Sequence, residues 1–124
     1  MASLNESARK AWENRQGPCI LTTVSPDKTP NSIYVTCVSQ FGDDAILVAD
    51  NFFSKTRDNV KKGGIASLLY MGADGTAIQI KGRVEYQTQG PAFDDMKKWN
   101  GSRPGVGVAL VKIDSVFNGS KQLC

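Results

Sequence analysis

The stretch of this chain best suited to chemistry is DNFFSKTR, residues 50–57, which directly follows the apolar run 45–49. We place Ser54 at the N-cap of a helix over 55–62. The first N–H groups of a helix lack backbone partners and carry partial positive charge, so they attract anions such as phosphate. Lys55 and Arg57 add charge where a cation is otherwise unfavourable. An ordinary capped surface helix explains the same residues. The tetrapeptide SKTR at 54–57 alone therefore leaves open whether this is a phosphate site or a surface helix.

The chain contains no histidine, and this excludes several kinds of catalytic site. Ser–His and Cys–His nucleophile pairs cannot be built, and zinc sites with histidine ligands are excluded. Cys19, Cys37 and Cys124 form no C-x-x-C pair, and we expect free thiols, with Cys124 exposed. No G-x-x-x-x-G-K-[ST] phosphate loop occurs either. If the protein is an enzyme, a cofactor is expected to supply the chemistry.

The length predicts a single domain, and the lack of a membrane-helix or signal-peptide pattern predicts a cytoplasmic protein. The 124 residues match a single domain spanning 1–124. The net charge of +3 is too small to indicate nucleic-acid binding. The sequence contains no run of about 18 apolar residues, so we expect no membrane-spanning helix. The first 15 residues do not resemble a signal peptide.

Short periodic segments separated by Gly, Pro, Asn and Asp predict a mainly β protein. Ser3 and Glu6 fit a capping box at the start of the first helix. Gly82 is expected to form a bulge or bend, and the first three strands are expected to form an antiparallel meander. The predicted helices cover 3–15, 55–62 and 90–100, and the predicted strands 19–24, 32–40, 45–50, 65–71, 76–88 and 106–117. About six short strands indicate a closed or partly closed barrel.

The order of these segments resembles the pyridoxamine 5′-phosphate oxidase-like family, the FMN-binding split barrels. The resemblance covers about residues 17–90 and rests on Asn51 with Ser54-Lys55-Thr56, ASLL at 66–69 and KGRVE at 81–85. It implies a six-stranded antiparallel Greek-key split barrel with two to three short helices. It also implies a homodimer with FMN at the subunit interface.

The family's cofactor contacts carry over to eight positions of this sequence. Lys55 and Thr56 match positions that hold the FMN phosphate. Ala49 and Asp50 match the end of the strand that borders the flavin. The strand that lines the isoalloxazine ring, largely through backbone groups, is matched by Ile33, Tyr34, Val35 and Thr36. Plain strand alternation would instead turn two of these four side chains into the core without a ligand.

The chain also departs from the oxidases that act on vitamin B6. It lacks their basic, histidine-containing segment near the C-terminus, and Ala77 stands where a flavin-contacting glutamine is expected. Gln79 follows two residues later. A shorter member of the family that does not oxidise vitamin B6 is therefore the better match.

Four functional hypotheses follow. The first is an FMN-dependent oxidoreductase of unknown substrate, with Tyr34 as a possible proton donor or simply a packed residue. The second is a non-catalytic FMN-binding or electron-transfer protein, which an NAD(P)H oxidation assay would separate from the first. The third is a split barrel with another cofactor or none. The fourth is a nucleic-acid-binding barrel, which needs a basic stripe with aromatic platforms. Only Phe52, Phe53 and Lys55 cluster in that way, and this disfavours the fourth hypothesis.

Overall fold

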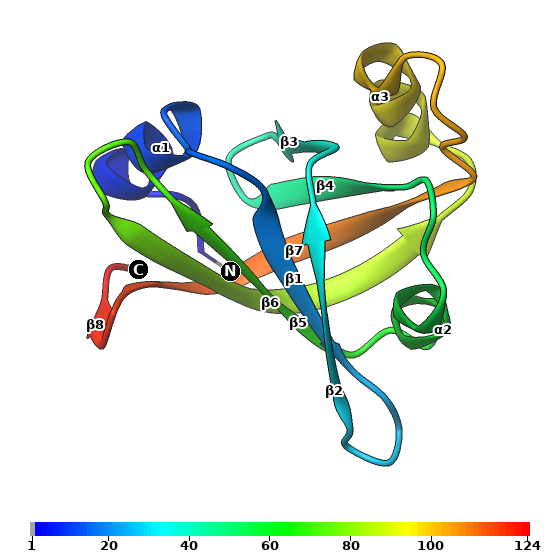
Figure 1. Cartoon of the computed structure of the whole chain (residues 1–124), viewed down its shortest axis with the longest axis horizontal. Helices are drawn as coiled ribbons and strands as arrows, with labels where there is room; N and C mark the ends of the chain where they lie inside the picture. Colours follow the sequence, from blue (N-terminus) through cyan, green and yellow to red (C-terminus); the bar gives the residue numbers. More distant parts are fainter. Residues whose placement is uncertain (1) are drawn as a thin grey trace.

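A computed structural model of the chain describes residues 2–124. All its strands belong to one curled antiparallel sheet, and three short helices lie around it (Figure 1). The elements are α1 (Glu6–Glu13), β1 (Cys19–Val24), β2 (Pro30–Val35), β3 (Val38–Phe41), β4 (Ala45–Asp50), α2 (Lys55–Lys61), β5 (Ile65–Met71), β6 (Ala77–Gln87), α3 (Pro91–Asn100), β7 (Gly107–Asn118) and β8 (Lys121–Gln122).

The strand order is β2-β1-β5-β6-β7-β4-β3, with β8 paired to β7 outside this path. Strands β4 to β7 form a Greek key, because β5, β6 and β7 are joined in sequence while β4 returns to lie beside β7. The predicted mainly β split barrel is therefore confirmed. The expected number of six strands is wrong, since the described residues form eight.

The expected strand over 32–40 is also wrong, because the chain changes partners in its middle. β2 pairs with β1, whereas β3 pairs with β4 at the opposite end of the sheet order. Thr36 and Cys37 connect the two, and the Cys37 carbonyl accepts a hydrogen bond of 2.9 Å from the Ala49 N–H. Two antiparallel hairpins, β1–β2 and β3–β4, replace the expected meander. The opening between their outer strands is the split of the barrel.

The barrel interior is filled by alternate side chains of the strands, and α1 packs against this core. Leu21, Ile46 and Leu68 are fully buried there. Trp12 of α1 meets the ring of Tyr70 edge-on at 5.1 Å. The N-cap of α1 is Asn5, whose side chain accepts from the Ala8 N–H at 2.9 Å, so the predicted capping box at Ser3 is wrong.

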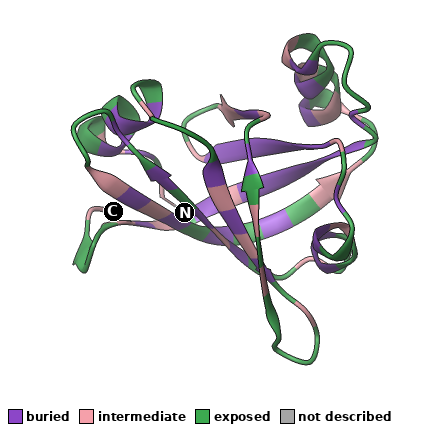
Figure 2. Cartoon of the chain, in the orientation of Figure 1, coloured by how far each residue is buried: buried purple, intermediate pink, exposed green. Residues whose placement is uncertain are grey.

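Strand β4 is buried on both faces, as its continuous apolar sequence indicates (Figure 2). One face points into the barrel, and the other lies under α3, where Leu47 and Met96 belong to a second apolar cluster. The same double coverage applies to the first half of β7. The C-terminal end of β4 is thereby held rigidly between two packed layers, and the residues that follow it form the candidate site.

Three smaller expectations have clear outcomes. The strands over 19–24, 45–50 and 65–71 are confirmed with the same bounds. Gly82 is confirmed as a bulge, because the pairing of β6 with β7 shifts there and an added Cβ would collide with the Lys112 carbonyl. Cys124 was expected to be exposed but is half-buried, with its thiol donating to the Ser3 carbonyl.

No helix within residues 2–124 is long and apolar enough to cross a membrane.

Candidate functional site

A surface hollow of about 300 Å³ lies where the β2–β3 connection faces the loop after β4. Its walls come from two segments that are adjacent to the split of the barrel: residues 33–37 on one side, and Ala49 with residues 51–53 on the other. Apolar and aromatic side chains predominate, with few polar groups. This composition is typical of sites that bind small organic ligands and cofactors.

The hollow brings together five of the eight predicted cofactor residues: Ile33, Tyr34, Val35, Thr36 and Ala49. Side chains alternate along β2, so Ile33 and Val35 pack against the barrel core. Tyr34 is 75% exposed and Thr36 is also exposed. Because β2 is an edge strand, its outer backbone N–H and C=O groups are free to face a ligand. The arrangement fits contacts through the backbone of residues 33–36.

Asp50, the sixth predicted residue, is buried, and both oxygens of its carboxylate accept hydrogen bonds from other groups of the protein. Its Oδ1 accepts from the Phe53 N–H and from Arg57 Nη2, both at 3.0 Å. Its Oδ2 accepts from Arg57 Nε at 2.6 Å and from the Tyr86 hydroxyl at 2.5 Å. The carboxylate is 0% exposed. Asp50 therefore fixes the turn from β4 into α2, and only its backbone is left to border a ligand.

The same contacts set the protonation of this cluster. Burial alone would raise the pKa of Asp50, but hydrogen bonds from Arg57 and Tyr86 outweigh it and leave the pKa below its ordinary value. Burial and the hydrogen bond to Asp50 raise the pKa of Tyr86 to about 12. At neutral pH the cluster therefore consists of a carboxylate, a guanidinium and a neutral phenol. It contains no group poised to exchange a proton.

Lys55 and Thr56, the remaining two predicted residues, occupy the first turn of α2 but differ in exposure. Thr56 is buried, and its hydroxyl accepts from Asn31 Nδ2 of β2 at 2.9 Å. Lys55 is exposed, and within residues 2–124 no carboxylate lies at ion-pair distance from it. Arg57, by contrast, is neutralised by Asp50. Of the two cations in SKTR, only Lys55 is free to meet an anion.

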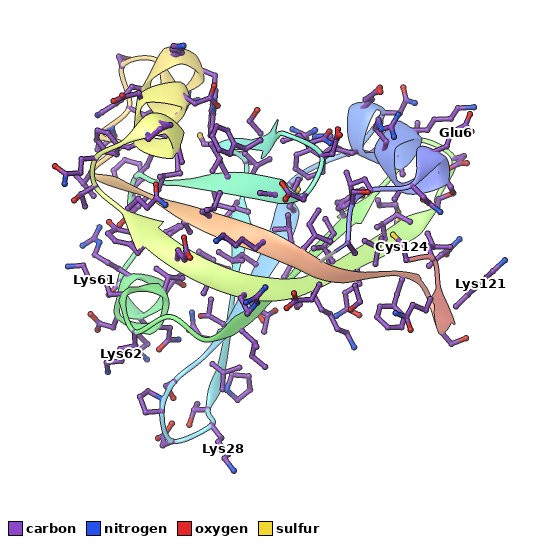
Figure 3. The ribbon with its side chains drawn as sticks, turned by 180° about the vertical axis from the view of Figure 1, so that it is seen from behind. Glu6, Lys28, Lys61, Lys62, Lys121 and Cys124 are labelled. Carbon is purple, nitrogen blue, oxygen red and sulfur yellow. The ribbon has the colours of Figure 1, made fainter. Side chains whose placement is uncertain are left out.

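The first turn of α2 has one further feature. Ser54 is confirmed as the N-cap, although its side chain makes no capping hydrogen bond. Lys61 lies in the last turn of the helix and Lys62 is its C-cap; both are labelled beside α2 in Figure 3.

Sequence reasoning gave no role to two polar contacts at this site. Tyr86 reaches Asp50 from β6, and Asn51 pairs with Asn100 at the end of α3. Asn51 was part of the recognised motif, but its partner lies 49 residues away. Nothing in a single sequence signals contacts between such distant polar residues.

Comparisons with known proteins agree with this architecture. The pyridoxamine 5′-phosphate oxidase family profile matches residues 5–116. Among solved structures, HupZ of Group A Streptococcus superposes with a TM-score of 0.81 at 19% identity, covering 93% of each chain. An FMN-binding protein from Syntrophomonas wolfei subsp. wolfei gives 0.67 at 24% identity, covering 90% of this chain and 83% of its own.

A pyridoxamine 5′-phosphate oxidase-related, FMN-binding protein from Nostoc punctiforme gives a TM-score of 0.58 at 12% identity, covering 84% of this chain and 76% of its own. At such identities the structural likeness concerns the fold alone. A search of curated protein sequences gave no significant match.

Proposed function

The chain belongs to the pyridoxamine 5′-phosphate oxidase family, and from this premise we propose that it binds FMN in the hollow beside β2. The observation that carries the proposal is the position of this hollow. The hollow is lined by residues 33–36 and by Ala49. Phe53 also lines it, and α2 begins two residues later with Lys55, a free cation. An aromatic ring system and a phosphate need those two features at neighbouring places.

The residues present fit the two parts of the cofactor differently. The isoalloxazine ring would lie against the backbone of residues 33–36, with Ala49 and Phe53 as apolar walls. Lys55 and the unpartnered N–H groups at the start of α2 would hold the phosphate. Thr56 would contribute its backbone rather than its hydroxyl, which is buried against Asn31. The negative charge of the FMN phosphate would thus be balanced by Lys55, and its oxygens would accept hydrogen bonds from the N–H groups of the helix.

The flavin would supply electron or hydride transfer, and this chain would bind it, orient its ring and keep water from one face. We propose an FMN-dependent oxidoreductase as the first candidate. A non-catalytic electron-transfer protein is the second candidate. The Asp50–Arg57–Tyr86 cluster at the end of β4 offers no acid–base pair poised near neutral pH, and this favours that second candidate. Oxidation of NADH or NADPH by the FMN-loaded protein separates the two, because only the first candidate turns over.

We further propose that a second copy of the chain completes the site. The outer face of β1, β2 and β5 carries exposed apolar side chains, among them Ile65 at 67%, Met71 at 49% and Leu69 at 40%. The register places Tyr34, Ile20 and Leu69 in one row across this face. Tyr34 also lines the hollow. A copy that covers this apolar face would therefore also close over the flavin.

Leu69→Glu should convert the dimer to a monomer and lower FMN binding at least about tenfold, because a buried unpaired carboxylate opposes association. Light scattering gives the mass, and quenching of flavin fluorescence gives the affinity. Ser7→Asp, which adds one negative charge on the exposed side of α1, is the control and should leave both unchanged. A Leu69→Glu protein that stays dimeric would show that the copies meet elsewhere.

The proposal of FMN binding is tested by adding FMN to the purified protein and removing the excess by gel filtration. The expected result is one flavin per chain, seen as the two absorption bands of an oxidised flavin in the protein peak. A colourless protein peak after saturation would refute it.

A further inference from the structure

Asn51 and Asn100 form a reciprocal amide pair that joins the rim of the hollow to the end of α3. Asn51 Nδ2 donates to Asn100 Oδ1 at 3.1 Å, and Asn100 Nδ2 donates to Asn51 Oδ1 at 2.8 Å. Asn51 Oδ1 also accepts from the Gly105 N–H at 2.9 Å. Asn51 lines the hollow, whereas Asn100 is 1% exposed. Hydrogen bonds thus connect Asn51, at the surface of the candidate site, to the buried Asn100.

These contacts fix the orientation of the Asn51 side chain. A backbone N–H can only donate, so the atom of Asn51 that faces Gly105 has to be the carbonyl oxygen. Gly105 adopts a φ of +49°, and an added Cβ would meet the side chain of Asn100 at 2.8 Å. The loop is therefore built closely around the amide pair. The second amide hydrogen of Asn51 makes no hydrogen bond within residues 2–124.

The loop that follows α3 is held at a second point by the neighbouring residue. The Val106 N–H donates to the Asp50 carbonyl at 3.0 Å. Two consecutive residues at the C-terminal end of β4, Asp50 and Asn51, thus hold two consecutive residues of the α3–β7 loop, Gly105 and Val106. These two hydrogen bonds join the rim of the hollow directly to the loop.

We propose that Asn51 is a positioning residue of the flavin hollow and that Asn100 and Gly105 hold it in place. Ligand binding in the hollow and the order of the loop over 101–106 are then coupled, although no residue of that loop lines the hollow. Such coupling is reciprocal: a ligand that steadies the rim steadies the loop, and a loosened loop weakens the ligand equally. The proposal rests on FMN binding as proposed above.

Hydrogen exchange with and without FMN tests the coupling in the full chain. In the wild type, FMN should slow exchange of the Gly105 and Val106 amides several-fold. Asn100→Ala should abolish this protection and raise the FMN dissociation constant about tenfold, which corresponds to the loss of roughly one hydrogen bond. Asn100→Asp keeps the acceptor and the volume but loses the donor, and it should act in the same direction even if the alanine variant folds poorly.

Leu110→Ala is the matched control, since it loosens the apolar packing beneath α3 without removing a hydrogen bond of Asn51 or of the loop over 101–106. It should lower the melting temperature yet keep both FMN affinity and FMN-dependent protection. If the wild type binds FMN and exchange at 105 and 106 does not respond, the coupling is wrong while FMN binding stands. The same holds if both Asn100 variants bind FMN as the wild type does. A wild type that fails to bind FMN overturns both proposals.

Discussion

Replacing Lys55 with glutamate is expected to weaken FMN binding about a hundredfold and to leave the fold intact. Lys55 is exposed and has no acidic partner within residues 2–124, so its charge contributes little to folding. A phosphate at the start of α2 would lose an attractive cation and gain a repulsive carboxylate at the same position. Flavin fluorescence titration measures the affinity, and thermal unfolding reports the fold.

Lys62→Glu provides the matched control, because it makes the same charge change at the other end of the same helix. The long-range electrostatic effect on an anionic ligand is similar for both variants, whereas only Lys55 can contact the phosphate. Riboflavin, which lacks the phosphate, should bind the wild type and Lys55→Glu equally. If Lys55→Glu retains normal FMN affinity, the phosphate is held elsewhere and Lys55 belongs to an ordinary surface helix.

Asp50→Ala is expected to cost about 3 kcal/mol of unfolding free energy, the largest stability loss that we predict for a polar residue. The substitution leaves the Arg57 guanidinium, the Tyr86 hydroxyl and the Phe53 N–H without their acceptor at a buried position. Urea unfolding measures the loss. Asp114→Ala is the control: its ion pair with Arg83 is exposed and 3.4 Å long, so the change should cost less than about 1 kcal/mol.

The contribution of Asp50 should also depend on pH in a defined direction. Its pKa is lower in the folded protein than the unfolded value of about 3.9, so its stabilising effect is present above that value. The effect is lost as the pH falls through the folded pKa. The difference in unfolding free energy between wild type and Asp50→Asn should therefore be constant near neutrality and shrink below about pH 4. A difference that stays constant into acid would exclude the carboxylate cluster as its source.

Strands whose sequence is governed by one face or by full burial were predictable from the sequence. The runs 19–24 and 65–71 alternate or are rich in β-branched and apolar residues, and β4 is apolar from Ala45 to Ala49 because α3 covers its outer face. Local physics decides such segments. The resemblance to the family added the arrangement of the sheet, which periodicity alone leaves open.

Features that depend on contacts between distant segments were not predictable. The sequence 32–40 looks like one strand, yet it divides at Thr36 and Cys37 because the ends of the curled sheet have different partners. The sequence assigns positive charge at the start of α2 to both Lys55 and Arg57, but Asp50, seven residues before Arg57, neutralises Arg57. The hydrogen bond from Tyr86 to Asp50 spans 36 positions of the sequence, and the one from Asn100 to Asn51 spans 49. No local sequence pattern predicts contacts over such separations.

A crystal structure of the protein grown with FMN tests the central claim most directly. We predict the isoalloxazine ring in the hollow, against the backbone of residues 33–36, and the phosphate within hydrogen-bond distance of Lys55 Nζ. We also predict a second copy of the chain across Tyr34 and Leu69. Flavin bound at another surface, or no flavin at saturating FMN, would contradict the account and leave a split barrel with a different ligand or none.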